Sequence, residues 1–168
     1  MMYRTIEEFL TDWNQEAALT LQVLESLTDA SLAQAVSDKQ ARTLGDLGWH
    51  LAGSIGVFFG ASGLALDGPD YRLPTPTRAA DIAEAYRQLS ESAKKALQEQ
   101  WTDAKLAEKL LLFGFIDTTY GGVLTTLVRH QIHHRGQMTI LMRQAGLVAP
   151  SIYGPNEEDS AAMRASKA

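Results

Sequence analysis

The chain has 168 residues, of which 45% are apolar and 21% charged, the composition of an ordinary globular protein large enough to bury one core. It contains no cysteine, which excludes a disulfide framework, a thiolate metal site and a cysteine nucleophile, and fits a reducing cytoplasm. The net charge of −5 argues against nucleic acid as a partner, because phosphate binding depends on clustered lysine and arginine.

Neither a secretory signal nor a membrane span is expected. The N-terminal segment MMYRTIEEFL is charged early and has no apolar h-region. The longest apolar segments are interrupted by Gly, His or Arg well short of the roughly 20 residues that a spanning helix needs. We therefore expect a cytoplasmic protein that acts on a small-molecule substrate, with no membrane or nucleic-acid partner.

Two helices are predicted in the first part of the chain. Thr5 begins a capping box, and apolar residues follow at helical intervals to about Thr28. After a short polar connection over residues 31–40, with room for one helical turn, Thr43 is the predicted N-cap of a second helix that ends near Gly60 or Gly63. A strand is the alternative for this second run, but its apolar residues do not alternate. The run also contains glycines 45, 48, 53 and 56, which would let another helix or a ligand approach closely.

A long loop and a third helix follow. The loop over residues 63–77 is rich in Pro, Gly and Asp, and its length would allow the helices on either side of it to lie parallel. Thr77 is the predicted cap of the third helix, which runs to Trp101. A short helix is predicted over residues 102–110, and the stretch LLFGFIDTTYGG after it reads as irregular.

A fourth helix is predicted from about residue 118 to 145, with Gly146 as its C′ residue. Residues 156–168 read as a loosely held, flexible tail. Four long helices without a confident strand predict an all-α fold, with a four-helix bundle over residues 1–155 followed by that tail.

Three of the four histidines lie within five positions of the fourth predicted helix. On a helix that advances about 100° per residue, His130 and His134 differ by about 40° and project side by side from consecutive turns. Both fall in the apolar stripe that must face the core, whereas His133 lies about 60° to the other side of His130 and off that stripe. His130 and His134 are therefore the better ligand pair.

His50 is the fourth histidine, and it points inward from the second predicted helix among small neighbours. If these two helices are neighbours, three neutral imidazoles meet in the core, where a divalent transition metal such as zinc or nickel would satisfy them. Three protein ligands leave a coordination position for water or substrate, which is typical of a catalytic site. The alternative is an ordinary hydrogen bond for each histidine, but an i,i+4 pair with a third histidine favours the metal.

Four neighbouring polar residues are each open to two interpretations. Asp46, one turn before His50, could orient an imidazole from the second shell or only cap its helix. Gln137 could touch the open coordination position or only pack, and we favour the contact. His133 and Arg135 could bind a partner helix or an anionic ligand group, or lie on a solvated face.

The fourth predicted helix also has a second apolar strip, made of Leu124, Val128, Ile132 and Met142. The two strips together exceed what one helix seam requires. The second strip could pack against another neighbour in the bundle or form the interface of a homodimer.

Four segments, HLA at His50, HQIHHRGQ from His130, MRQAGL and YGPNEED, together resemble the DinB/YfiT superfamily of small metal-binding proteins, in order and over nearly the whole chain. The resemblance implies a four-helix bundle of up-down-down-up topology with long crossover loops, often dimeric, and a three-histidine metal site near one end. Carried over residue by residue, it makes the ligands His50, His130 and His134.

The activity that this resemblance implies is less specific. Characterised relatives include low-molecular-weight thiol transferases and a thiol-dependent isomerase, and others are described as metal-dependent hydrolases. The first expectation is a metal-dependent thiol S-transferase, in which the metal activates a low-molecular-weight thiol for attack on an electrophilic substrate. A hydrolase that activates water at the metal, and a non-catalytic metal- or ligand-binding stress protein, are the alternatives, because a shared fold does not determine chemistry.

Overall fold

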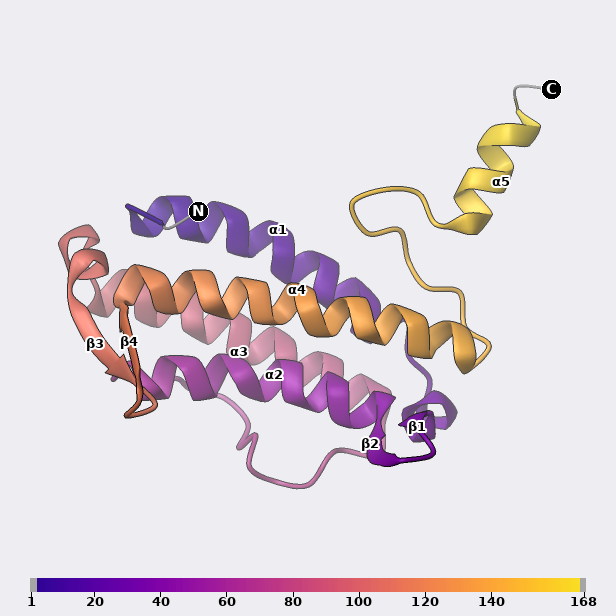
Figure 1. Ribbon diagram of the computed structural model, residues 1–168, viewed down its shortest axis with the longest axis horizontal. Coiled ribbons are helices and arrows are strands. Elements are labelled where there is room, and N and C mark those ends of the chain that lie inside the picture. Colours follow the sequence, from indigo (N-terminus) through magenta and orange to yellow (C-terminus); the bar gives the residue numbers. More distant parts are fainter. Residues whose placement is uncertain (1–2, 167–168) are drawn as a thin grey trace.

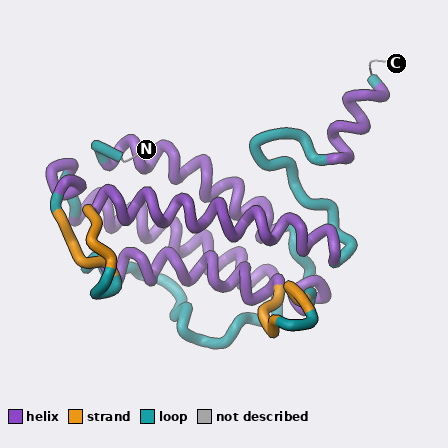
Figure 2. Tube along the Cα trace, viewed as in Figure 1, coloured by secondary structure: helices purple, strands orange, loops and turns teal. Residues whose placement is uncertain are grey.

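The computed structural model describes residues 3–166, and most of them are helical (Figures 1 and 2). Four long helices, two short 3-10 helices, two β-hairpins and one C-terminal helix make up the described part of the chain. In chain order the elements are α1 (Ile6–Glu25), η1 (Asp29–Ala33), β1 (Ala35–Ser37), β2 (Gln40–Thr43), α2 (Leu44–Ala61), α3 (Ala79–Gln100), η2 (Asp103–Ala107), β3 (Lys109–Leu112), β4 (Ile116–Thr119), α4 (Tyr120–Gln144) and α5 (Glu157–Ala165). None of the helices within residues 3–166 is long and apolar enough to cross a membrane.

Each of the four long helices packs against two of the others. α1 lies against α3 and α4, and α2 lies against the same two helices, so that α1 and α2 are diagonally opposite. In Figure 1, α1 and α4 run from left to right, whereas α2 and α3 run from right to left. The parallel course of α2 and α3 is possible because the long connection between them returns along the whole length of α2. The predicted predominance of helix is confirmed.

The two hairpins correct the expectation of a chain without strands. β1 pairs with β2, and β3 with β4, both antiparallel and at opposite ends of the long helices (Figure 2). The β3–β4 hairpin replaces the stretch that was expected to be irregular, and only residues 103–107 of the short helix predicted over 102–110 are helical. The hairpin turns through Phe113 and Gly114, both at positive φ, which matches the right-handed twist of the strands. Strands of four residues are too short to show a clear alternating pattern.

The helix starts follow local capping chemistry in α1 and α2 but not in α3. Thr5 forms the predicted capping box, and Thr43, the predicted N-cap of α2, forms one with Asp46. The predicted cap at Thr77 is wrong, because α3 begins at Ala79 and has no side-chain cap from its own N-terminal residues. The Ala79 N–H donates instead to Oδ1 of Asp29 at 2.7 Å, so a residue of η1 satisfies the start of a helix that is distant in the sequence.

Both apolar strips of α4 contribute to the core. Leu124, Val128 and Met142 of the second strip are buried, and of its four residues only Ile132 is exposed. The second strip therefore packs within the protein, against a second neighbouring helix. A homodimer stays a prediction.

The chain leaves α4 as the sequence indicates. Gly146 has a φ of +77°, and its N–H donates to the carbonyl of Arg143, as expected of a C′ glycine. The predicted tail contains α5, which has no buried residue and projects away from the four long helices (Figure 1). The ion pair between Arg143 and Glu158 links it to α4. The domain division at residue 155 and the flexibility of the tail stay predictions.

Candidate metal centre

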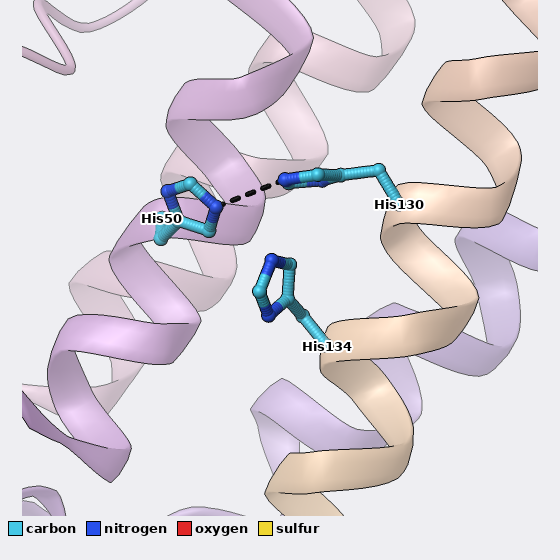
Figure 3. A group of neighbouring side chains, drawn as sticks. All are labelled: His50, His130 and His134. Carbon is cyan, nitrogen blue, oxygen red and sulfur yellow. Dashed lines mark hydrogen bonds between the residues drawn. The ribbon is translucent and has the colours of Figure 1, made fainter.

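Three histidines from two helices converge on one point (Figure 3). His50 comes from α2, and His130 and His134 come from consecutive turns of α4. One ring nitrogen of each lies within 4.8 Å of the other two, and the Nε2 atoms of His50 and His130 are 3.0 Å apart. All three side chains are partly buried. The structure thus brings together the three residues that helical spacing and apolar surroundings singled out.

A buried glutamine holds the two helices in the register that this convergence needs. The Gln131 amide, fully buried beside His130, donates to the carbonyl of Leu51 at 3.0 Å and to Oγ of Ser54 at 2.9 Å. This contact joins α4 to α2 directly after His50. Sequence reasoning missed Gln131, although an amide on the buried side of a helix is a signal that it must find a partner on another element.

Gln137 orients His134 rather than facing the centre of the cluster. Its Oε1 lies 2.7 Å from Nδ1 of His134, and an amide oxygen can only accept, so Nδ1 carries the proton. The other ring nitrogen of His134, Nε2, is therefore left with a free lone pair. The Gln137 amide nitrogen lies 3.2 Å from Nε2 of the exposed His133, which can accept from it. Gln137 and His133 together determine the tautomer of His134.

The surroundings keep these imidazoles neutral. Burial lowers the pKa of His50 and of His130 to about 4, and it also lowers the pKa of His134. The neighbouring imidazoles and the guanidinium of Arg42 add to the effect on His50 and His130, because each disfavours a further positive charge. Neutral imidazole, with a lone pair available, is the form that binds a metal ion.

The donor set fits a divalent transition metal. The three rings cannot satisfy the hydrogen-bonding capacity of all their nitrogens among themselves. The 3.0 Å contact between Nε2 of His50 and Nε2 of His130 uses one proton, and no described residue donates to Nε2 of His134. A tetrahedral ion with metal–nitrogen distances of about 2.0–2.1 Å holds its ligand atoms roughly 3.3 Å apart. This spacing is close to the 3.0 Å between the Nε2 atoms of His50 and His130. Three nitrogen donors without a carboxylate suit zinc, nickel or a similar ion better than magnesium or calcium.

Asp46 acts as a helix cap and as an anchor for the following loop. Its carboxylate accepts from the Thr43 backbone at 3.0 Å and from Oγ1 of Thr75 at 2.7 Å, and the Thr75 hydroxyl is the main reason that its pKa is lowered. Its described hydrogen-bond partners include no imidazole. The capping interpretation therefore accounts for Asp46, which still lines the space beside His50.

The solvated-face interpretation of Arg135 is wrong. Arg135 is 1% exposed and faces α1, about 100° around α4 from the adjacent His134. Its guanidinium donates to the Glu16 carboxylate at 2.6 Å and to the Glu16 carbonyl at 2.9 Å, and Tyr153 completes the cluster. The sequence around Arg135 does not indicate this pairing, because Glu16 lies more than a hundred residues away.

A small cavity opens beside the histidines. It has a volume of about 310 Å³ and is lined by His50 and His130 together with Asp46, Trp49, Gly53, Ser54, Val57, Phe58 and Tyr71. Larger hollows elsewhere, such as one of about 770 Å³ between β4 and α4, contain none of the three histidines. The small cavity thus joins the donor cluster to a mostly apolar, aromatic wall.

Comparison with known proteins agrees with the resemblance predicted from the motifs. The chain matches the model of the DinB family over residues 2–167. It belongs to the DinB family. The protein YrdA of Bacillus subtilis (strain 168) is 44% identical over 158 residues, which cover 94% of this chain and 93% of YrdA.

Two solved structures of the DinB family are similar to this one. The crystal structure of a DinB-like protein from Bacillus cereus ATCC 10987 has a TM-score of 0.85 and 42% identity, over 90% of this chain and all of that chain. The DinB-like protein YjoA from Bacillus subtilis has a TM-score of 0.65 and 18% identity, over 89% of this chain and 99% of that one, and this likeness shows the fold alone.

Proposed function

We propose that this DinB-family protein is an enzyme that binds one divalent transition metal, zinc or nickel, through His50, His130 and His134. The observation that carries the proposal is the convergence of three neutral imidazole nitrogens that no described residue fully satisfies. A bound metal of this kind supplies Lewis acidity and lowers the pKa of a thiol or a water molecule. The four long helices would form the up-down-down-up bundle of the family, and the directions in which they run support this.

The protein's own residues position the reactants. Gln137 holds His134 by accepting from Nδ1, which keeps the Nε2 lone pair of that ring directed at the cluster. Three protein ligands leave room for a further group, and the cavity lined by His50 and His130 provides the space beside them. The aromatic lining of this cavity would exclude water from a bound apolar substrate.

The reaction that the cavity supports best is thiol S-transfer. Three lining residues besides the histidines are charged or hydroxylic, namely Asp46, Ser54 and Tyr71. Asp46 and Ser54 are already engaged, since Asp46 accepts from Thr75 and Ser54 accepts from Gln131, and the phenol of Tyr71 carries a proton rather than a free basic group. None of the three is suited to act as a general base for water, whereas a thiolate needs no base once it has lost its proton. The chain has no cysteine, so the thiol must be a separate low-molecular-weight reactant.

The proposed step is a displacement at carbon. The thiolate sulfur forms a bond to an electrophilic carbon of the substrate while the bond from that carbon to its leaving group breaks. The leaving group departs with the electron pair, as chloride from a chloroarene or as the ring oxygen of an epoxide, which then takes up a proton. No oxidant or reductant is required.

The test is the thiol dependence of turnover. Zinc- or nickel-loaded protein is incubated with an epoxide or a chloroarene, with and without added 2-mercaptoethanol, and the products are identified by mass spectrometry. We expect a thioether product that requires both metal and thiol. Hydrolysis without thiol would overturn the transferase in favour of a hydrolase, and tight metal binding without turnover of any substrate in a broad panel would favour a non-catalytic binding protein.

A further inference from the structure

The connection between α2 and α3 lies along α2 as a strap, which we define as residues 64–77. The strap runs antiparallel to α2 (Figure 1). Two hydrogen bonds fix its later part, one from Nε1 of Trp49 to the carbonyl of Leu73 at 2.9 Å and one from Oγ1 of Thr75 to Asp46 at 2.7 Å. The strap is therefore held against the same face of α2 that carries the cavity.

Tyr71 of the strap lies in a slot made by two glycines of α2. A Cβ atom at Gly56 would come within 2.2 Å of Cε1 of Tyr71, and one at Gly53 within 3.1 Å of the Tyr71 Cβ. The first distance is shorter than any two carbon atoms tolerate without a bond, so the ring can approach the helix this closely only because position 56 has no side chain. Gly53 and Gly56 thus allow Tyr71 of the strap to pack closely against α2.

The ring of Tyr71 forms a wall of the cavity that also contains His50 and His130. Trp49, Val57 and Phe58 supply the remaining apolar surface, and the Phe58 ring centroid lies 5.5 Å from that of His130. A volume of about 310 Å³ is at the lower end of the range for ligand sites, and most of the lining is apolar or aromatic. The cavity is therefore suited to small apolar groups.

We infer that Tyr71, seated in the slot of Gly53 and Gly56, is the specificity-determining residue of the site and limits the size of the apolar groups that the site admits. The inference deepens the proposed function and depends on it in taking the histidine cluster as the reactive end of the cavity. The hydroxyl of Tyr71 has no described hydrogen-bond partner, so the restriction depends on the ring and its position.

The test compares two neutral probes, benzyl alcohol and 2-naphthalenemethanol, by ¹H–¹⁵N NMR of the full chain loaded with zinc. The indole N–H of Trp49, assigned with the Trp49→Phe variant, reports binding in the cavity. We expect wild-type protein to bind benzyl alcohol at least roughly tenfold more tightly than the fused-ring probe, which is the scale of steric discrimination in an apolar pocket. In Tyr71→Ala and Gly56→Ala, which remove or displace the wall, the two affinities should become equal within about threefold.

Two matched variants act as controls. Gly60→Ala lies on the same helix but has open space around its Cβ, and Tyr71→Phe keeps the ring, so both should keep the wild-type preference. If Tyr71→Ala and Gly56→Ala keep that preference too, or if neither probe shifts the Trp49 resonance in any variant, the inference is overturned. Repeating the titration without zinc separates the two proposals, because size selection by the wall persists without metal, whereas absence of metal binding contradicts only the proposed function.

Discussion

His134 and Arg135 are adjacent in the sequence, yet they belong to two polar clusters that differ in one decisive respect. Arg135 is buried and faces α1, where its guanidinium donates to Glu16 and Thr20, and Tyr153 adds a further acceptor. His134 faces α2, where it meets two further imidazoles and no described donor for its free nitrogen. The residues of the first cluster hydrogen-bond to one another, whereas the second leaves an imidazole nitrogen without a described donor, which is the position that the proposed metal would use. The two clusters thus differ in whether their polar groups find partners within the described chain.

The largest expected effect is the loss of metal from the cluster of His50, His130 and His134. His134→Ala should abolish stoichiometric zinc binding while the protein stays helical, because only two nitrogens remain and the ring is not part of the closed core. Metal content by X-ray fluorescence and circular dichroism measure the two outcomes. His133→Ala, which removes the neighbouring exposed ring, should keep the metal, and loss of metal from that variant would show that the wrong ligand pair was assigned.

The next largest effect concerns the buried pair of Arg135 and Glu16. Arg135→Ala leaves the Glu16 carboxylate buried without its positive counter-charge and should lower the free energy of unfolding by about 3–5 kcal/mol. Urea denaturation measures it. The matched control is Arg143→Ala on the same helix, whose ion pair with Glu158 is largely exposed, so that its loss should change the free energy of unfolding far less. Equal losses in the two variants would contradict the distinction between the clusters.

A smaller effect is expected from Gln137, which orients His134 but is not one of the three proposed metal ligands. Gln137→Leu removes the oxygen that accepts from Nδ1 of His134 and should weaken metal affinity by about 10–100-fold without abolishing binding. Competition with a chelator of known affinity measures the change. Gln144→Leu, on an exposed part of the same helix, is the control, and wild-type affinity in the Gln137 variant would exclude its positioning role.

The smallest effect is a dependence of stability on pH in the metal-free protein. The folded-state pKa of His50 and of His130 is about 4, below the ordinary 6.5, so between these values the unfolded chain takes up protons that the folded protein does not. Stability should therefore be highest above pH 6.5 and fall as the pH decreases towards 4. Urea midpoints at pH 7 and pH 5 measure the trend. His130→Leu should reduce it, and a midpoint independent of pH would contradict the buried, neutral state of the rings.

The parts of the structure that local patterns determine could be predicted. The 3.6-residue period predicted the long helices, and the spacing of His130 and His134 placed both rings on one face. Glycine at position 146 likewise indicated where α4 ends. These features depend on residues within one or two helical turns of each other.

Features that depend on contacts between distant segments could not be predicted. The start of α3 is satisfied by Asp29, and the charge of Arg135 is paired with Glu16 of another helix. The hydrogen bond between Gln137 and His134 could not be predicted, because helical spacing places the two side chains one turn apart but does not show to which group the amide is directed. The two hairpins escaped notice because each strand has only three or four residues.

The central claim is that three imidazoles of one chain bind one metal ion and leave a position open beside the cavity. X-ray absorption spectroscopy of the zinc-loaded protein tests it most directly. The account predicts one zinc per chain, three imidazole nitrogens at about 2.0–2.1 Å and at least one further light ligand. Substoichiometric zinc, or a spectrum that requires fewer than three imidazoles, would contradict it.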